Sequence, residues 1–285
     1  MKCSSLVTLG LVLAVCGLMA LALTGCGSSA TQTEAAQARE AKDQPKASAS
    51  NPSQGSGKGM AAIQQASEAG KYLFIFFSKA DDDQTLAMRK VFDQAMEKVA
   101  DRAQSVAVSI ADASEAAIVD KFDLSRAPMP LVLVMAPNGA ITGGFPTQFE
   151  EQQLVDAFAT PGTEKVMKSL QDGKLVFVCV QNGTTSSNDA ALQGVRDFKA
   201  DVRYASATEI VTLDPSDQAE AGFLTDLQVP SDTKEAVTVF VVPPGQAIGK
   251  IEGATNKDAL VELLSRANTS CGPGGCGPGG CGPTK

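Results

Sequence analysis

Apolar residues in the first half of the chain follow two alternating spacings. Segments 60–69 and 84–103 have the spacing of amphipathic helices, whereas 72–77 and 131–135 are short continuous apolar runs. Continuous apolar strands between helices are typical of a sheet that is covered on both faces. The pattern predicts an α/β fold with a central mixed sheet flanked by helices. Further strands are expected at 105–110 and 140–145, and further helices at 115–121 and 150–158.

The same order of elements occurs twice. Gly70 directly precedes the first apolar strand and Gly173 precedes the apolar run 175–180, as a residue that ends a helix would. Val-Met-Ala-Pro-Asn-Gly, ending at Gly139, is echoed by Val-Val-Pro-Pro-Gly, ending at Gly245. We therefore predict two tandem domains, 60–160 and a more diverged 161–268, each of about a hundred residues.

Residues 1–25 have the layout of a signal peptide. Lys2 is followed by an apolar run over 6–23, and Leu23-Thr24-Gly25-Cys26 resembles the bacterial lipobox. The resemblance implies a lipoprotein in which Cys26 is acylated, with more than one chain such as diacylglycerol and palmitate, and thereby inserted into membrane lipid. An uncleaved membrane span is the alternative, because about 18 apolar residues could just cross a bilayer, but it leaves the lipobox unexplained.

Segment 26–59 contains almost no large apolar residue and is predicted to be a disordered tether. We expect a protein of the bacterial cell envelope that is lipid-anchored and faces the periplasm or the exterior. The sequence does not distinguish the inner from the outer membrane.

Composition excludes several classes of function. The formal net charge is −8 and no basic stripe occurs, which argues against a nucleic-acid partner. The chain has no histidine, so the usual general base and the Ser-His and Cys-His nucleophile pairs are absent. Most hydrolase chemistry is thereby excluded, and a role other than catalysis is favoured.

Pro128-Met129-Pro130 directly precedes an apolar strand that ends in a Pro-Asn-Gly turn. This arrangement resembles the thioredoxin fold, and the second copy resembles a diverged version of it with Ala236 in place of the proline. The resemblance implies that Pro130 follows a cis peptide bond and faces the redox site.

The cysteine pair of that family is missing. Its Cys-x-x-Cys would lie after the first core strand, where this chain has Ala80-Asp81-Asp82-Asp83-Gln84, and segment 182–187 of the second copy has no cysteine either. Asp81, Asp82 and Asp83 are best explained as a helix cap with an acidic first turn. A Ca²⁺ or Mg²⁺ site is the alternative. Ser186-Ser187-Asn188 is interpreted as the cap of the corresponding helix.

Two further sets of sulfur-containing residues have ordinary explanations. Met88 and Met96 have helical spacing, so core packing is favoured over a thioether copper site formed with Met129. Cys179 lies inside an apolar run and is predicted to be a buried, inert thiol.

The C-terminal segment 269–285 is predicted to be a flexible tail in which cysteine recurs every five residues, at Cys271, Cys276 and Cys281. Three interpretations remain open. The tail could exchange thiols and disulfides, it could hold Cu(I), or it could be a passive or cross-linking end. Zinc fits less well, because structural zinc sites use four ligands.

The functional prediction is a protein-binding or accessory lipoprotein whose two domains are redox-inactive at the family site. By resemblance, the groove formed by Asp81, Asp82, Asp83, Met129 and Pro130 meets an extended polypeptide, here an unknown envelope protein. The alternative is thiol-disulfide redox or copper handling by Cys271, Cys276 and Cys281. If the protein is an enzyme, its activity is that of a thiol-disulfide oxidoreductase in the tail.

Overall fold

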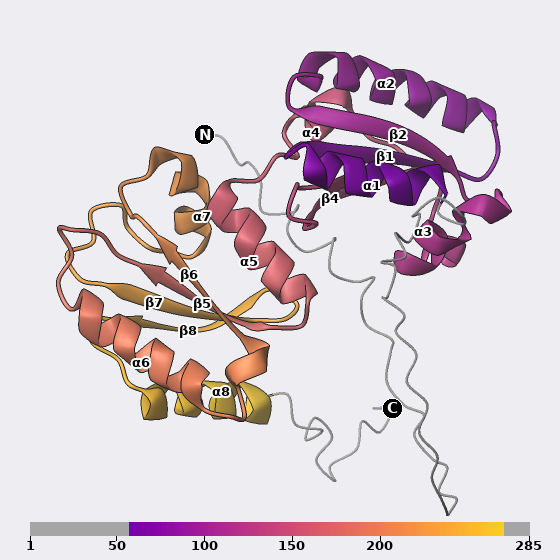
Figure 1. The fold of residues 1–285 in the computed structure, drawn as a ribbon. Coiled ribbons are helices and arrows are strands. Elements are labelled where there is room, and N and C mark those ends of the chain that lie inside the picture. Colours follow the sequence, from indigo (N-terminus) through magenta and orange to yellow (C-terminus); the bar gives the residue numbers. More distant parts are fainter. Residues whose placement is uncertain (1–56, 271–285) are drawn as a thin grey trace, which may run out of the picture.

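The computed structural model describes residues 57–270, which form two α/β domains (Figure 1). Domain 1 comprises α1 (Lys58–Glu68), β1 (Tyr72–Ser78), α2 (Asp83–Val99), β2 (Ala103–Ser109), α3 (Ala116–Lys121), β3 (Leu131–Met135), β4 (Ile141–Pro146) and α4 (Glu151–Val155). Domain 2 comprises α5 (Pro161–Gln171), β5 (Leu175–Val180), α6 (Asn188–Ala200), β6 (Thr208–Leu213), α7 (Ala221–Asp226), β7 (Val237–Val242), β8 (Gln246–Glu252) and α8 (Lys257–Ser270).

The two sheets have the same topology. Domain 1 has strand order β2-β1-β3-β4, and domain 2 has β6-β5-β7-β8. In each, the first strand pairs in parallel with the second and antiparallel with the third. Both final hairpins also have a register shift, at Val134/Met135 and at Phe240/Val241. The predicted mixed sheet and its repetition are confirmed.

Each sheet is covered by helices on both faces. Successive residues of β1 point to opposite sides, so that Phe74 packs with α2 in one core cluster while Ile75 packs with α1 and α3 in the other. In domain 2, Val178 packs towards α5 and α7, and Phe177 packs towards α6 and α8. Burial on both sides explains why these strands are continuous apolar runs.

Both predicted helix terminators are confirmed. Gly70 and Gly173 have φ of 63° and 75°, which a residue without a Cβ adopts readily. The following main-chain N–H groups, of Lys71 and Lys174, donate at 2.9 Å to carbonyl oxygens five residues earlier. The two helices therefore end in the same motif, which satisfies otherwise unpaired carbonyl groups and leads the chain into the central strand.

A buried carboxylate is repeated in both domains, and sequence reasoning missed it. Glu115 is 1% exposed and accepts a hydrogen bond from the main-chain N–H of Gly59 at 3.0 Å. Glu220 is 4% exposed and accepts one from Gly162 at 2.7 Å. Each carboxylate satisfies an N–H at the start of the first helix of its domain and so joins α1 to α3, and α5 to α7.

Two predicted helices are longer than the observed ones. The helix expected to reach residue 103 ends at Val99, because the N–H of Tyr72 donates to the carbonyl of Arg102 at 3.2 Å and draws that residue into the sheet. The helix expected over 150–158 ends at Val155. Beyond it the chain turns back, and the N–H of Ala159 donates to the Tyr72 hydroxyl at 2.9 Å.

Direct hydrogen bonds join the two domains. The Tyr72 hydroxyl donates at 2.5 Å to Glu164 of α5, and burial and this bond raise the pKa of Tyr72. Gln171, at the end of α5, exchanges two 2.8 Å hydrogen bonds with the main chain of Ile141. Helix α5 therefore belongs to the core of domain 2 and also contacts domain 1. Within residues 57–270, none of the helices combines the length and apolar character needed to cross a membrane.

Candidate functional site

The segment before β3 lies at the edge where the predicted groove was expected. The Met129–Pro130 peptide bond is cis, as the sequence resemblance implies. Antiparallel pairing of β1 with β3 stops at Phe77↔Leu131, so Met129 lies just beyond the paired strands, at the end of β1 that leads into α2. The structure thus brings Met129 and Pro130 to the same sheet edge as the aspartate loop.

Met129 presents its main chain without a partner. Pro128 and Pro130 have no N–H, so the N–H of Met129 is the single main-chain donor of this tripeptide. Among residues 57–270, neither that N–H nor the Met129 carbonyl forms a hydrogen bond, whereas the Pro130 carbonyl accepts from Thr147 at 2.6 Å. Met129 therefore offers one donor and one acceptor to an added strand.

The aspartate loop caps helix α2, as predicted. Asp82 is the N-cap, and its side chain accepts a hydrogen bond from the N–H of Thr85 at 2.7 Å. This hydrogen bond is the main reason why the pKa of Asp82 lies below its usual value. Asp83 is the first helical residue, and Asp81 is exposed before it. Within the described range, no three acidic or cysteine side chains are grouped as metal ligands would be.

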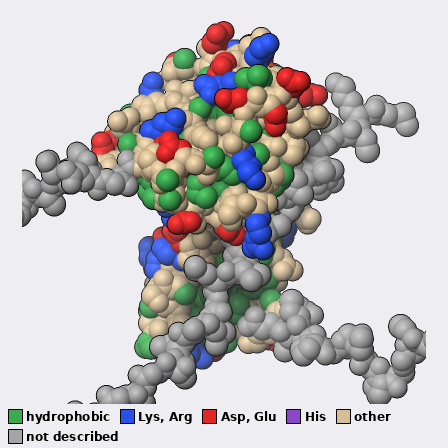
Figure 2. All heavy atoms as spheres, turned by 90° about the vertical axis from the view of Figure 1, so that its right-hand side faces the viewer, with side chains coloured by type: hydrophobic (Ala, Val, Ile, Leu, Met, Phe, Trp, Pro, Cys, Tyr) green, Lys and Arg blue, Asp and Glu red, His purple; other side chains and the backbone are tan. Residues whose placement is uncertain are grey.

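The start of α2 reaches across β3 to the far side of this edge. The side-chain amide of Gln84 donates to the carbonyl of Thr147 at 3.1 Å, just after β4, and β3 lies between β1 and β4. One turn along from the cap, Leu86 is 50% exposed. Figure 2 shows hydrophobic side chains gathered on the side of domain 1 that faces the viewer. Sequence reasoning missed Leu86, although an apolar residue on the polar face of a helix is a readable signal.

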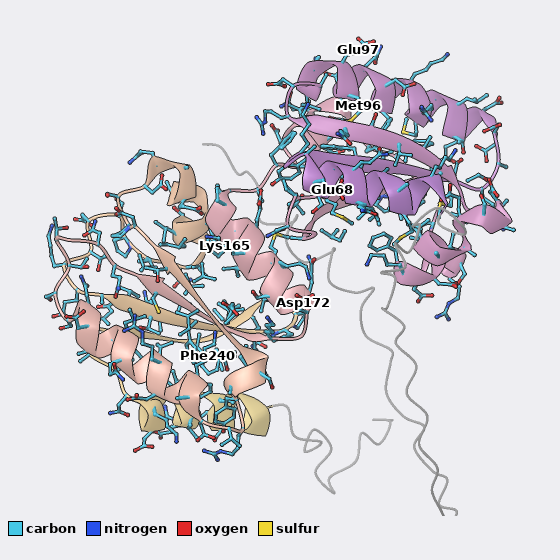
Figure 3. The ribbon with its side chains drawn as sticks, in the orientation of Figure 1. Glu68, Met96, Glu97, Lys165, Asp172 and Phe240 are labelled. Carbon is cyan, nitrogen blue, oxygen red and sulfur yellow. The ribbon has the colours of Figure 1, made fainter. Side chains whose placement is uncertain are left out.

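The methionines do not form a common site. Met88 and Met96 of α2 pack against the core cluster of Phe74 on one face of the sheet, and Met96 points towards the sheet in Figure 3. Met129 packs against the cluster of Ile75 on the other face. Core packing is therefore confirmed for the α2 methionines, and the alternative thioether copper site is contradicted.

The corresponding edge of domain 2 is occupied by the chain itself. The N–H of Ser186 donates to the carbonyl of Lys234 at 2.9 Å, and the N–H of Ala236 donates to the carbonyl of Ser186 at 2.9 Å. These two bonds form a parallel bridge between Ser186 and Glu235, directly before β7. Because Ala236 has an N–H where Pro130 has none, domain 2 can form a bond that domain 1 cannot.

Hydroxyl and amide groups hold the loop of domain 2 in this position. Thr185 is 8% exposed, and its Oγ1 accepts from the N–H of Asn182 at 2.9 Å and lies 2.7 Å from Asn188 Oδ1. The Asn182 amide also donates to Asp214 at 2.8 Å. Ser187, inside the predicted cap segment, is at the N-cap position, but its side chain accepts no cap hydrogen bond. Thr185 and Asn188 instead bond to Asn182 and to each other.

Cys179 is buried, as predicted. It is 2% exposed in the cluster of Phe177 and Phe198, where Phe240 also lies (Figure 3). Burial raises the pKa of its thiol from 9.0 to about 12, so the nucleophilic thiolate is scarce at neutral pH.

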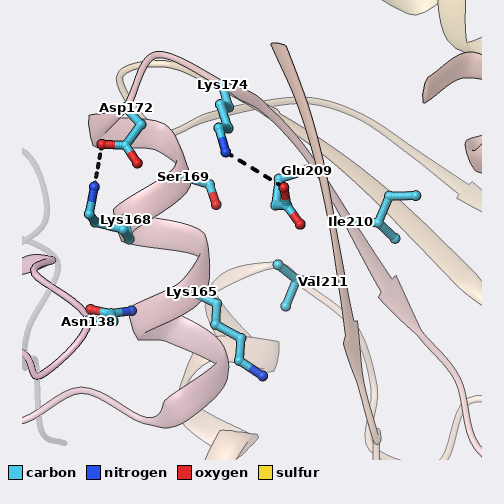
Figure 4. A pocket seen from close by; sticks show the side chains of 9 residues that line it. All are labelled: Asn138, Lys165, Lys168, Ser169, Asp172, Lys174, Glu209, Ile210 and Val211. Atoms are coloured by element: carbon cyan, nitrogen blue, oxygen red, sulfur yellow. Dashed lines mark hydrogen bonds and ion pairs between the residues drawn. The ribbon is translucent and has the colours of Figure 1, made fainter. Parts of the chain in front are cut away.

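A separate hollow lies between α5 and β6, with Asn138 of domain 1 at its rim (Figure 4). Its volume of about 220 Å³ is below the usual range of ligand pockets. Four of its five charged side chains are paired, Lys168 with Asp172 and Lys174, at 3.8 Å, with Glu209, and Lys165 is the fifth. We assign it no ligand.

Several predicted residues lie outside the described part of the chain. These are the signal peptide with Cys26, most of the tether, and the tail cysteines Cys271, Cys276 and Cys281.

No protein-family model matches the chain, and no curated protein matches it. Solved structures similar to it include Arabidopsis thaliana thioredoxin O2 in the oxidised state, with 15% identity over 40% of this chain and 87% of that one and a TM-score of 0.29. The first two thioredoxin domains of Saccharomyces cerevisiae Eps1p match with 12% identity over 72% and 94%, and a TM-score of 0.27. Zinc-bound human ERp44 matches with 10% identity over 74% and 58%, and a TM-score of 0.31.

The fold is a tandem of two domains, each a mixed four-stranded sheet flanked by helices, and domain 1 has the cis-proline that the resemblance to the thioredoxin fold implies.

Proposed function

We propose that the protein is a lipoprotein of the bacterial cell envelope that binds an extended polypeptide segment at the groove of domain 1. The groove comprises Asp81, Asp82, Asp83, Met129 and Pro130, together with Leu86. The observation that carries the proposal is the unpaired main chain of Met129 at the sheet edge where α2 begins. Leu86, exposed in the first turn of that helix, adds an apolar side chain. Domain 2 provides a comparison within the same chain, because its equivalent edge is already paired with its own residue Ser186.

The proline pattern defines how a segment would pair. A parallel bridge of the kind seen in domain 2, in which the residues on either side of the bridged one supply the hydrogen bonds, would need an N–H at residue 130, and Pro130 has none. An antiparallel bridge uses the N–H and the carbonyl of a single residue. Met129 has both, and we infer a partner segment that runs antiparallel to 128–130 and exchanges two main-chain hydrogen bonds with Met129.

The proposal assigns no dithiol chemistry to either groove. Neither the segment 79–84 nor the segment 181–188 contains a cysteine. Cys26 would hold the protein to lipid by acylation, and the tether 26–59 would separate the groove from the membrane surface.

The test uses a labelled peptide of alternating valine and glutamine and a twin whose main-chain nitrogens are methylated on alternate residues. Fluorescence anisotropy with the mature chain should show saturable binding of the parent peptide only. Leu86→Asp should abolish that binding, whereas Val202→Asp should leave it unchanged, because Val202 is 91% exposed on domain 2. Equal binding of the methylated twin, or equal loss with Val202→Asp, would contradict the proposal.

A second candidate function rests on the cysteine repeat of the tail. Three thiols spaced by Gly-Pro-Gly-Gly could close a small disulfide loop or bind Cu(I). Intact mass of protein purified from membranes, with alkylation before any reductant, separates these roles. Adducts that appear only after reduction favour redox or cross-linking, and excess mass removed by a copper chelator favours metal handling. Free thiols without metal would leave the groove as the functional site.

A further inference from the structure

The edge of domain 1 that carries the groove is acidic. Asp81, Asp82 and Asp83 follow β1, and Asp112 follows the adjacent parallel strand β2. The N–H of Ile110 donates to the carbonyl of Ser78 at 2.8 Å, so the two loops leave the sheet side by side. All four carboxylates belong to exposed residues.

Few of these charges are compensated nearby. Lys79 lies in the same loop, and Lys58 helps to lower the pKa of Asp112 after the main effect of hydrogen bonds from Ser114. This edge therefore carries four acidic side chains and only two lysines nearby. On the other side of the Met129 segment, Arg126 pairs with Asp123 at 4.0 Å, which leaves that side close to neutral.

The equivalent loop of domain 2 has a different character. Segment 181–187 contains no charged residue, and Asp214, which follows β6, is hydrogen-bonded to Asn182 and Ser216. Asp189 in the first turn of α6 and Asp217 after β6 are also acidic, so carboxylates occur at this edge in both domains. Domain 1 therefore differs in having three consecutive aspartates between β1 and the start of α2, where domain 2 has uncharged residues.

We propose that the segment bound by domain 1 is basic and apolar, with a lysine or arginine next to the residue that pairs with Met129. In an extended strand, successive side chains point to opposite faces. An apolar side chain would then lie against Met129, while its neighbour points towards the start of α2, where a basic group can meet Asp81 and Asp83. This inference rests on the proposed function and adds the chemistry of the partner to it.

The expected preference is moderate, because the carboxylates are exposed and each such pair contributes little in water. The same peptide with lysine in place of every glutamine should bind about tenfold more tightly than one with glutamate at those positions, and raising the salt concentration should shrink the difference.

The experiment compares the glutamine, lysine and glutamate peptides by anisotropy with the mature chain, at low and at high salt. Asp81→Asn combined with Asp83→Asn should remove most of the lysine preference and leave the Asp82 cap intact. The matched control is Glu97→Gln with Asp101→Asn, which removes the same charge at the opposite end of α2, where Glu97 points into solvent (Figure 3).

Two results would overturn the inference, and they are distinguishable. If all three peptides bind equally and the Asp81/Asp83 variant changes nothing, the charge preference is wrong while the groove function stands. If none of the peptides binds, both proposals fail.

Discussion

The loops after β1 and after β5 leave equivalent strands but take different paths. In domain 1, segment 79–82 leads directly into α2 and leaves Met129 unpaired. In domain 2, the longer segment 181–187 returns to the sheet and places Ser186 against the residue before β7. The same fold therefore has one open edge and one edge that its own chain closes, so a shared topology does not imply a shared binding capacity.

The largest predicted effect concerns the thiol of domain 2. At pH 8, Cys179 should react about a thousandfold more slowly with an alkylating reagent than the same residue in urea, since its pKa is raised from 9.0 to about 12. Peptide mapping separates it from the other cysteines. Because the unfolded thiol ionises first, its contribution to stability is complete below pH 9 and declines above it. Rapid labelling of native Cys179 would contradict the account.

The same pKa difference predicts how the pH dependence of folding changes on mutation. Above pH 9, the free energy of unfolding should fall less steeply in Cys179→Ala than in the parent chain. Urea titrations at several pH values measure this, and identical slopes would show that the native thiol is not shifted.

The next prediction concerns the buried glutamate that each domain contains. Glu220 accepts hydrogen bonds from Gly162 and from the Thr160 hydroxyl, whereas Glu115 accepts one from Gly59. Glu220→Ala should cost about 4 kcal/mol of unfolding free energy and Glu115→Ala about 2 kcal/mol. The glutamine variants keep an acceptor and should lose less. If Glu115→Ala lost as much unfolding free energy as Glu220→Ala, or more, the predicted difference between the two glutamates would be wrong.

The third prediction tests how domain 2 stays closed. Thr185→Val keeps the shape of the side chain but removes the hydroxyl that holds Asn182 and Asn188. We expect a loss of about 1 kcal/mol and faster exchange of the Ser186 amide by about fivefold. Exchange measured by NMR provides the readout. Unchanged exchange would mean that the bridge does not depend on this network.

The smallest predicted effect compares the two helix starts. Asp82→Ala should speed exchange of the Thr85 amide by about threefold, because it removes an N-cap acceptor. Ser187→Ala should change nothing in α6, since the Ser187 side chain accepts no cap bond. A response in α6 as large as that in α2 would be inconsistent with the structure.

Much of the fold is readable from local sequence. The apolar run 131–135 matches β3, and Gly70 and Gly173 mark helix ends, because burial on both faces and a left-handed φ restrict residue type strongly. Helix ends were less accurate, since Arg102 and Ala159 take hydrogen-bond partners far away in the sequence.

The candidate site was predicted only in part. The position of Asp82 and Pro130 follows from strand and cap signals, but the closure of domain 2 depends on a bridge between Ser186 and Glu235 that local sequence does not specify. The buried Glu115 and Glu220 were missed for the same reason, because a charged residue is assigned to the surface unless its distant partner is known.

The most direct test of the central claim is amide hydrogen exchange of Met129, Ser186 and Ala236 in the protein, with and without the lysine peptide. We predict that Met129 exchanges fast alone and at least tenfold more slowly with peptide, whereas Ser186 and Ala236 are protected in both states. If Ser186 and Ala236 exchange as fast as Met129, or if the peptide leaves Met129 unchanged while protecting the domain 2 edge, the assignment of an open and a closed groove is wrong.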